Sequence, residues 1–285
     1  MTRILVAGCG YVGAALAAEL RDAGHAVFGL KRSAGGLPDG VVPIAADLGD
    51  RDALRAALAP IGAPIEIAVY AAAADAGDDA AYQRAYGTGL GNCLAALRER
   101  GDPLRHVFFT SSTSVYAQDD GSRVDESSPT EPTNFRGTRM LEAERVLATS
   151  GLRATALRLG GIYGPGRTRM IENVRNGRAV LRAAPHFGNR IHRDDAAGAL
   201  AHLVALALRG VEVPAILLGV DDEPADEADV LRWIASQLGV PAPPLRGEAG
   251  AATGKRCSNA RLRATGYRFR YPSYREGYAA ALTSP

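Results

Sequence analysis

The stretch "RILVAGCGYVG" near the start of the chain constrains the fold more than any other. Its apolar part is typical of a buried β-strand, and Gly8, Gly10 and Gly13 follow it in the spacing GxGxxG, where an Ala- and Leu-rich helix should begin. In that context the first glycine permits a tight turn, the second lets a pyrophosphate approach the backbone, and the third lets helix pack on strand. The helix N-terminus adds amides and a positive dipole for phosphates. The pattern predicts a dinucleotide site that includes Tyr11 and Val12; a turn that is merely rich in glycine is the alternative.

Up to about residue 160, the chain alternates short apolar β-rich runs with Ala- and Leu-rich helical runs. Such alternation is typical of a parallel sheet covered on both faces by helices. After it, short helices mix with turns rich in Pro and Gly, which indicates a smaller C-terminal cap. The predicted fold class is therefore α/β, a doubly wound parallel sheet of Rossmann type. We expect a cofactor-binding domain at 1–165 and, at 166–285, mainly a substrate-binding cap with some segments that return to the first domain. The expected strands are 3–8, 26–30, 41–45, 65–71, 106–112 and 154–160, and the expected helices 11–23, 50–59, 78–100 and 137–149.

Composition excludes several classes of protein. A chain of 285 residues with 47% hydrophobic residues can bury a core without a metal or disulfide staple. Cys9, Cys93 and Cys257 match no CxxC or CxxH spacing, so we expect buried free thiols and no metal site. The net charge of +2 is spread along the chain without a basic run, which argues against nucleic-acid binding. No signal peptide or long apolar span is visible, so the chain is predicted to be cytoplasmic, with a small-molecule substrate and without a membrane partner.

The end of the second predicted strand bears on the choice of cofactor. An NAD enzyme places Asp or Glu there to bind the ribose 2′-hydroxyl, but this chain has Lys31, Arg32 and Ser33. Two cations and a hydroxyl suit a 2′-phosphate, so we expect NADP(H) in preference to NAD(H); ordinary loop cations are the alternative. Asp47, just past the third strand, could accept from the adenine amino group or cap the helix that begins near Arg51.

In their order and spacing, seven motifs resemble the extended branch of the short-chain dehydrogenase/reductase superfamily, which includes NAD(P)-dependent nucleotide-sugar epimerases and dehydratases. The resemblance covers nearly the whole chain. It implies that Asp47 contacts adenine and that Leu48, Ala71, Ala72 and Ala73 line the cofactor. The motifs are "GCGYVG", "ADLGD", "VYAAA", "SSTSVYA", "LRLGGIYGPG", "RIHRDDAAGAL" and "SNARLRATGY".

The same family uses a serine, a tyrosine and a lysine for proton transfer, the last two in a YxxxK segment. Ser112 takes the place of the serine and would orient the substrate oxygen. For YxxxK the candidate segment is "FRGTRMLEAE", which supplies Arg136 and Met140 in one register and Phe135 and Arg139 in the other. Neither register contains a phenol or a lysine. Arg139 could still hold a ribose hydroxyl, but a guanidinium does not shuttle protons.

A tyrosine also replaces an asparagine that often supports this relay. "YGTGLGNCL" puts Tyr86 at its position, on the helix that neighbours the predicted cleft. We hypothesise that the Tyr86 phenol transfers the proton together with Ser112. The alternative is an aromatic side chain that packs in the core or between helices.

Arginines gather in the predicted cap. Together with Asn189 and Arg190, Arg167 and Arg169 could line a pocket for a phosphate or carboxylate, because guanidinium groups bind such anions through paired hydrogen bonds. Each arginine alone also fits a solvated surface. In "IHRDDAA", Asp194 or Asp195 is expected to cap a helix that runs from Ala196 toward Leu208.

Two functions follow from these observations. The first is an atypical extended dehydrogenase/reductase, a reductase or an epimerase/dehydratase, that acts on a small polar substrate such as a nucleotide sugar or another anion. Gly161 weakens the nucleotide-sugar assignment, because related epimerases carry an asparagine near this position that contacts the diphosphate. The second function is a catalytically silent NADP(H) sensor or scaffold, since a fold does not dictate a function. Pairing of the helices 78–100 and 137–149 in a homodimer is expected from the resemblance.

Overall fold

The computed structural model describes residues 1–33 and 35–283, which form two compact units. Unit 1 comprises Met1–Tyr116, Thr130–Arg158 and Ala197–Leu217. Unit 2 comprises Ala117–Pro129, Leu159–Ala196 and the described residues from Leu218 onward. The chain thus passes between the units several times, and the expected boundary at residue 165 falls within one segment of unit 2.

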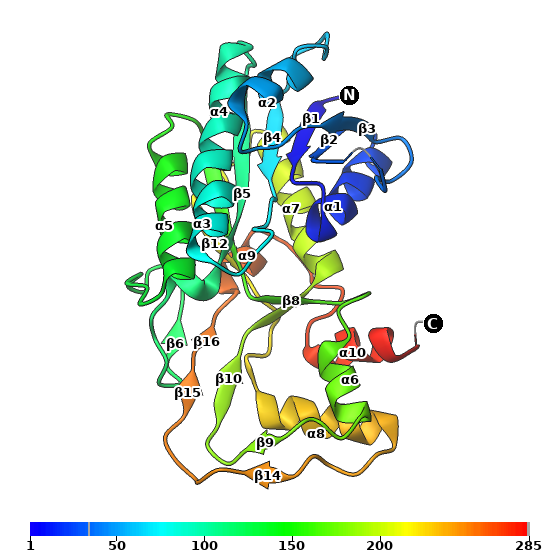
Figure 1. Cartoon of the computed structure of the whole chain (residues 1–285), viewed down its shortest axis with the longest axis vertical. Helices are drawn as coiled ribbons and strands as arrows, with labels where there is room; N and C mark the ends of the chain where they lie inside the picture. Colours follow the sequence, from blue (N-terminus) through cyan, green and yellow to red (C-terminus); the bar gives the residue numbers. More distant parts are fainter. Residues whose placement is uncertain (34, 284–285) are drawn as a thin grey trace. The chain divides into compact units, whose positions relative to one another are not determined.

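A seven-stranded parallel sheet forms the centre of unit 1 (Figure 1). The order of its strands is β12-β7-β5-β4-β1-β2-β3. From β1 the chain adds β2 and β3 toward one edge of the sheet, then returns to add β4 and the later strands on the other side of β1. Ile4, Leu5 and Val6 have no exposed surface, which is why this strand is apolar at successive positions. The strands are β1 (Arg3–Ala7), β2 (Ala26–Lys31), β3 (Val42–Ala45), β4 (Ile67–Tyr70), β5 (His106–Ser112), β7 (Ala154–Leu159) and β12 (Ile216–Gly219). The predicted α/β fold with a parallel sheet is confirmed.

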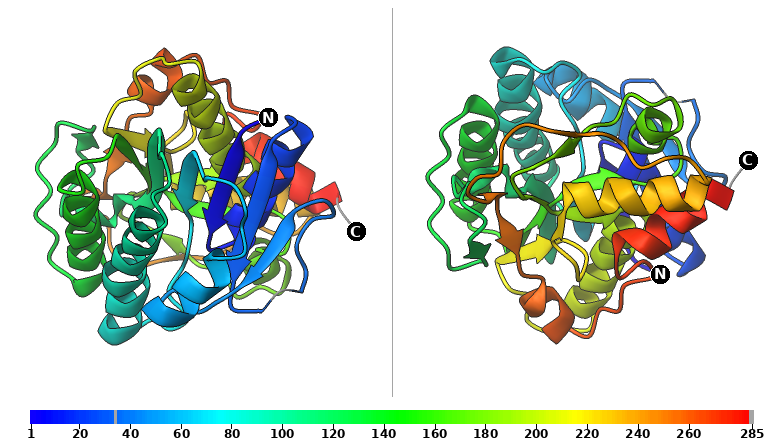
Figure 2. Two further views of the ribbon diagram at one scale, coloured as in Figure 1. Left: turned by 90° about the horizontal axis from the view of Figure 1, so that it is seen from above. Right: turned by 90° about the horizontal axis from the view of Figure 1, so that it is seen from below.

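Helices cover both faces of this sheet. On one face lie α2, α4 and α5, and on the other lie α1 and the part of α7 that starts at Ala197 (Figures 1 and 2). The predicted helix at 78–100 is interrupted by π-helical turns that contain Tyr86. The helices are α1 (Tyr11–Asp22), α2 (Arg51–Leu58), α3 (Asp79–Tyr82), the π segment η1 (Gln83–Thr88), α4 (Gly89–Glu99), the short 3₁₀ turn η2 (Thr113–Val115), α5 (Phe135–Ala148) and α7 (Arg193–Leu208).

Unit 2 contains short strands and helices around a core of its own. That core joins α6, α8 and α10 through residues such as Ile171, Ile234 and Tyr274. The helices are α6 (Arg169–Arg175), α8 (Glu227–Leu238), α9 (Ala260–Ala264) and α10 (Tyr274–Thr283). The strands are β6 (Arg123–Val124), β8 (Gly161–Tyr163), β9 (Leu181–Arg182), β10 (His186–Gly188), β11 (Arg190–His192), β13 (Ala225–Asp226), β14 (Leu245–Arg246), β15 (Thr253–Gly254) and β16 (Arg256–Cys257). Within the described residues, no helix is long and apolar enough to span a membrane.

Candidate functional site

The loop after β1 has the shape that a dinucleotide site needs. Gly8 has a positive φ of 91°, and a Cβ there would come within 2.2 Å of the Ala72 backbone nitrogen. A Cβ on Gly13 would lie 2.3 Å from the Gly8 carbonyl oxygen, whereas one on Gly10 would meet nothing within 4 Å. Gly8 and Gly13 are therefore required for packing within the protein, and Gly10 leaves open space that a ligand could approach. Tyr11 and Val12 follow as the first residues of α1.

The cysteine in this loop is not a reactive group. Cys9 is 1% exposed, and burial raises the pKa of its thiol to about 11. Its backbone N–H donates to the Leu30 carbonyl at 2.9 Å, as does the Gly8 N–H, which ties the glycine loop to β2. All three cysteines are buried free thiols, and no group of metal-binding side chains occurs among the residues described.

The three polar residues at the end of β2 differ in what they contact. Lys31 donates from Nζ to the Gly35 carbonyl oxygen at 2.9 Å. Arg32 extends from an exposed position and its Nη1 donates to Asp75 Oδ2 at 2.8 Å. Ser33 is exposed. Both cations are thus at the carboxyl edge of the sheet beside the glycine loop, where the sequence predicted a 2′-phosphate site.

Asp47 lies in the loop after β3 and does not cap the following helix. The N-cap of α2 is Asp50, whose Oδ1 accepts from the Ala53 N–H at 2.9 Å, so the capping alternative for Asp47 is wrong. Asp47 is exposed, and its Oδ1 accepts from the Gly49 N–H at 2.8 Å. Leu48 follows it, and Ala71–Ala73 continue from the end of β4, where Ala71 N–H donates to the Ala7 carbonyl at 2.7 Å.

Ser112 is the last residue of β5, at the same edge of the sheet. It is half-buried, and its Oγ accepts from the Ser114 N–H at 3.1 Å, which leaves its hydroxyl hydrogen for another acceptor. Tyr86 is 7% exposed in the π-helical segment η1, and its Oη accepts from the Ala74 N–H at 3.4 Å. Burial raises the pKa of this phenol, so it stays protonated at neutral pH.

The first turn of α5 contains the residues that the sequence offered for the two YxxxK registers. Phe135 packs edge-on against the Tyr82 ring, with ring centroids 5.4 Å apart. The guanidinium of the exposed Arg136 lies 5.5 Å from the Phe135 ring centroid, and Met140 is 5% exposed. Arg139 donates to both carboxylate oxygens of Asp79, at 2.7 and 2.8 Å, and to Glu142 at 2.8 Å. Its donors are therefore largely engaged, and a ribose hydroxyl would have to compete with two carboxylates.

A buried ionic cluster lies beneath this edge of the sheet, and it was not predicted from the sequence. Arg158 on β7 makes a two-pronged pair with Glu144 on α5, at 2.9 and 2.7 Å, and both side chains are about 95% buried. Arg158 also donates to the Tyr116 hydroxyl at 2.7 Å, and the Ser111 hydroxyl donates to Glu144 at 2.6 Å. Because Ser111 directly precedes Ser112, the cluster fixes the end of β5. The sequence signal was Glu144 in "LEAE", an acidic residue in an otherwise apolar stripe.

Unit 2 contains a cavity of about 860 Å³ beside α6 and α8. Arg167, Arg169 and Arg178 line it, and so do Glu172 and Glu227. Of the four predicted substrate residues, the structure thus brings Arg167 and Arg169 together. Arg178 belongs with them, and its place on the loop after α6 gave no signal in the sequence.

The other two predicted substrate residues are held within unit 2. The Asn189 carboxamide donates to the Lys255 carbonyl at 2.9 Å and accepts from the Cys257 N–H at 2.7 Å, so both of its ends join neighbouring chain segments. Arg190 is 7% exposed and donates to the Gly188 carbonyl at 3.1 Å. Neither lines the cavity.

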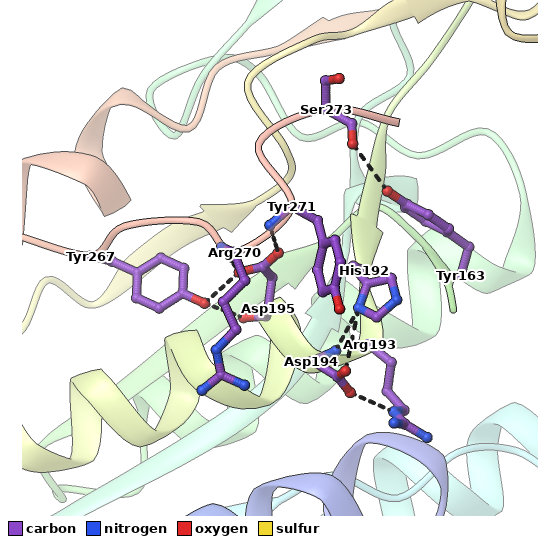
Figure 3. Close-up of polar contacts among 9 residues, drawn as sticks. All are labelled: Tyr163, His192, Arg193, Asp194, Asp195, Tyr267, Arg270, Tyr271 and Ser273. Carbon is purple, nitrogen blue, oxygen red and sulfur yellow. Dashed lines mark hydrogen bonds and ion pairs between the residues drawn. The ribbon is translucent and has the colours of Figure 1, made fainter. Parts of the chain in front are cut away.

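The acidic residues at the start of α7 have a role other than the expected one (Figure 3). The helix begins at Arg193, so Asp194 and Asp195 lie inside its first turn, and the prediction that one of them caps a helix from Ala196 is wrong. Asp195 is fully buried and accepts from Tyr267 Oη at 2.8 Å and from the N–H groups of Arg270 and Tyr271 at 2.8 and 2.9 Å. This carboxylate anchors the segment before α10.

His192 is part of the same structural cluster. It is 1% exposed, and burial lowers the pKa of its imidazole. Its Nδ1 accepts from the Asp194 N–H at 3.2 Å, and its ring lies edge-on to Tyr163 with centroids 5.4 Å apart (Figure 3). A neutral imidazole that is packed between rings fits a structural role better than that of a general base.

Asp221 is a buried carboxyl group in unit 2 that is only partly hydrogen-bonded. It is 2% exposed; its Oδ1 accepts from the Glu223 N–H at 3.2 Å and its Oδ2 has no partner among the described residues. Burial raises its pKa to about 8, with Asp222 and Glu223 adding to the shift and Arg190 opposing it. Because the folded protein holds this proton and the unfolded chain releases it near pH 4, stability should fall as pH rises from about 4 to 8.

We expect the unfolding free energy of Asp221→Asn to be close to that of the wild type at pH 5 and higher than that of the wild type at pH 8. An amide resembles the protonated carboxyl group, so the advantage should grow by about 2 kcal/mol between these two pH values. Urea unfolding at both pH values measures this difference. Asp229→Asn, at an exposed position on α8, is the control and should show no such trend. Parallel pH profiles for Asp221→Asn and the wild type would contradict the prediction.

Comparison with known proteins identifies a matching family and several relatives of this chain. Residues 4–219 match the NAD dependent epimerase/dehydratase family. The 3-diazoavenalumate denitrifying reductase of a Streptomyces species is 30% identical over 310 residues, which cover 96% of this chain and 98% of that protein. A structure from Methylobacillus flagellatus, described as that of a candidate NAD-dependent epimerase/dehydratase, is 41% identical, with a TM-score of 0.84 over 99% of this chain and 97% of that one.

More distant structures share the fold and contain nucleotides. The UDP-glucose 4-epimerase of Thermus thermophilus in complex with NAD is 23% identical, with a TM-score of 0.77 over 97% of this chain and 96% of its own. The human epimerase family protein SDR39U1, with NADPH, is 22% identical, with a TM-score of 0.76 over 98% of this chain and 97% of its own. Both nucleotides therefore occur with this fold.

Proposed function

Because the chain belongs to the NAD dependent epimerase/dehydratase family, we propose that it is an NADP(H)-dependent oxidoreductase that reduces a small, polar, anionic substrate. The observation that carries the proposal is the glycine loop, which leaves space at Gly10 and has Arg32 beside it at the end of β2. The pyrophosphate would lie at Gly10 and the N-terminus of α1, with the 2′-phosphate at Lys31, Arg32 and Ser33. NADPH supplies the hydride when bound.

Ser112 at the end of β5 and Tyr86 in η1 support reduction over epimerisation or dehydration. Reduction needs a proton donor for the developing alkoxide, whereas the other reactions need a base that takes a proton from the substrate. Burial raises the pKa of Tyr86, so its phenol carries a proton at neutral pH. It could donate this proton to an alkoxide, which is a stronger base, but it is not present as the phenolate that a base-initiated reaction needs. Ser112 would orient the reacting oxygen through its hydroxyl. In this proposal the reaction proceeds without the usual YxxxK dyad, since Phe135, Arg136, Arg139 and Met140 carry neither a phenol nor an amine.

The arginine-lined cavity of unit 2 supports an anionic substrate. Arg167, Arg169 and Arg178 outnumber the acidic residues Glu172 and Glu227 on its wall. Guanidinium groups bind phosphate or carboxylate through paired hydrogen bonds, and the carboxylates could accept from hydroxyl groups of the same ligand. The cavity's volume of about 860 Å³ is in the range of small-molecule sites.

We expect Arg32→Ala to weaken NADPH binding about 10- to 30-fold and NADH binding less than about twofold, because only NADPH has the 2′-phosphate. Calorimetric titration of both nucleotides measures the effect. Arg55→Ala is a matched control, since Arg55 is an exposed arginine on α2 whose ion pair is with Asp52 one turn away. If the wild type binds neither nucleotide, or if Arg32→Ala binds NADPH as well as the wild type does, the cofactor assignment fails.

A catalytically silent sensor is the second candidate, and the engaged state of Arg139 favours it. In the family the lysine of YxxxK holds the nicotinamide ribose, and here the residue of one register is bound to Asp79 and Glu142. Both functions require nucleotide binding. They differ in whether bound NADPH is oxidised by any member of a panel of carbonyl compounds that contain a carboxylate or a phosphate.

A further inference from the structure

An ion pair joins the two loops that follow the neighbouring strands of β1, which itself leads into the glycine loop. β1 lies between β2 and β4 in the sheet, and the three strands run parallel, so their carboxyl ends are side by side. Arg32 follows β2 and Asp75 lies in the loop after β4, and the two are joined at 2.8 Å. Between them the loop after β1 carries Gly8 and Gly10. A dinucleotide bound at this edge must therefore share the site with the pair.

Asp75 has more than one cationic neighbour. Nη2 of Arg84, in η1, lies 3.9 Å from Asp75 Oδ1, whereas Arg32 donates to the other carboxylate oxygen, Oδ2. The hydrogen bond from Arg32 is the main cause of the lowered pKa of this carboxyl group, so Asp75 is ionised at neutral pH. Without nucleotide, the guanidinium expected to meet the 2′-phosphate is thus neutralised by an anion of the protein itself.

We propose that Asp75 is a specificity-determining residue: it occupies Arg32 in the unliganded protein and is displaced by the 2′-phosphate of NADP(H). This inference rests on the proposed NADP(H) site. Arg32 and Asp75 are both solvent-exposed, and exposed ion pairs are weak, so the exchange is readily reversible. A phosphate carries more charge than a carboxylate and can accept two hydrogen bonds from one guanidinium, so it wins the competition. NAD(H) carries a neutral hydroxyl in place of the 2′-phosphate. This hydroxyl does not displace the Asp75 carboxylate from Arg32, so the ion pair stays intact.

The effect of Asp75 on affinity should differ between nucleotides with and without the 2′-phosphate. While Asp75 is present, binding of the 2′-phosphate must break one ion pair and place a dianion near a carboxylate. Removal of the carboxylate abolishes both costs, so affinity for the 2′-phosphate should increase. The affinity of ligands that lack this phosphate should change little. Asp75 thus lowers the preference for NADP(H) over NAD(H) below what Arg32 alone would give.

Adenosine 2′,5′-bisphosphate and 5′-AMP test the proposal, because they differ only in the 2′-phosphate. In calorimetric titrations, Asp75→Asn should tighten binding of the bisphosphate about 3- to 10-fold and change that of 5′-AMP less than about twofold. The gain should vanish in an Arg32→Ala background, which a double-mutant cycle measures. It should also shrink in high salt, because salt screens exposed charges. Asp52→Asn, which removes the carboxylate of an exposed pair on α2, is the control and should have no effect.

Other outcomes separate this inference from the function it rests on. If the wild type binds neither compound, the cofactor site and the inference fail together. If the wild type binds the bisphosphate and Asp75→Asn leaves its affinity unchanged, the inference alone is wrong. Weaker binding of both compounds in Asp75→Asn would also overturn it, since Asp75 would then support the loop after β4 rather than compete for Arg32.

Discussion

Gly10→Ala is expected to fold almost normally and to lose the nucleotide, whereas Gly13→Ala is expected to lose stability. A Cβ on Gly10 meets no atom within 4 Å, so the change in unfolding free energy should stay below about 1 kcal/mol. The same methyl group would occupy the space in which a pyrophosphate approaches the backbone, and NADPH affinity should fall at least about tenfold.

Gly13 differs because its close neighbour belongs to the protein. A Cβ at this position would lie 2.3 Å from the Gly8 carbonyl oxygen and 3.3 Å from Val6, so α1 must move away from β1. Overpacking against backbone should destabilise the protein by about 3 kcal/mol. Urea unfolding and calorimetric titration of both variants distinguish the two effects. A Gly10→Ala variant that keeps full NADPH affinity would mean that no phosphate lies at this loop.

Much of unit 1 was predictable because its signals are local. Strands buried on both faces are short apolar runs, and the six predicted strands of the sheet occur close to their expected positions. The resemblance to the extended short-chain dehydrogenase/reductases is likewise confirmed. The seventh strand, β12, was missed because "ILLG" stands alone in the second half of the chain, where no alternating pattern marks it. β12 pairs with β7, which is distant in the sequence, so a local sequence pattern does not reveal this pairing.

The roles of polar residues were harder to predict than the strands. Asp47, Asp50, Asp194 and Asp195 are all plausible caps by residue type, and only the backbone geometry shows that Asp50 is one and Asp195 is not. The partner of Asp195, Tyr267, lies 72 positions away along the chain. Long-range pairing also explains why the carboxylate that meets Arg32 was not foreseen.

Arg158→Met should lower the unfolding free energy by about 3–5 kcal/mol. The change leaves Glu144 at 6% exposure without its cation, while the Ser111 hydroxyl still donates to its carboxylate. A charge without its partner in the apolar interior has lost both water and the guanidinium, and this desolvation is the main source of the expected loss.

A second substitution separates charge from packing in this cluster. Arg158→Met combined with Glu144→Met replaces the pair by apolar side chains of similar length, and most of the lost stability should return, because no uncompensated charge stays buried. Arg232→Met, which breaks the exposed pair with Asp229, should cost less than about 1 kcal/mol and serves as the control. Urea unfolding at pH 5 and pH 8 measures all three variants. If the double variant is as unstable as Arg158→Met at both pH values, the hydrogen bonds to Ser111 and Tyr116, rather than the buried charge, hold β5 to β7 and α5.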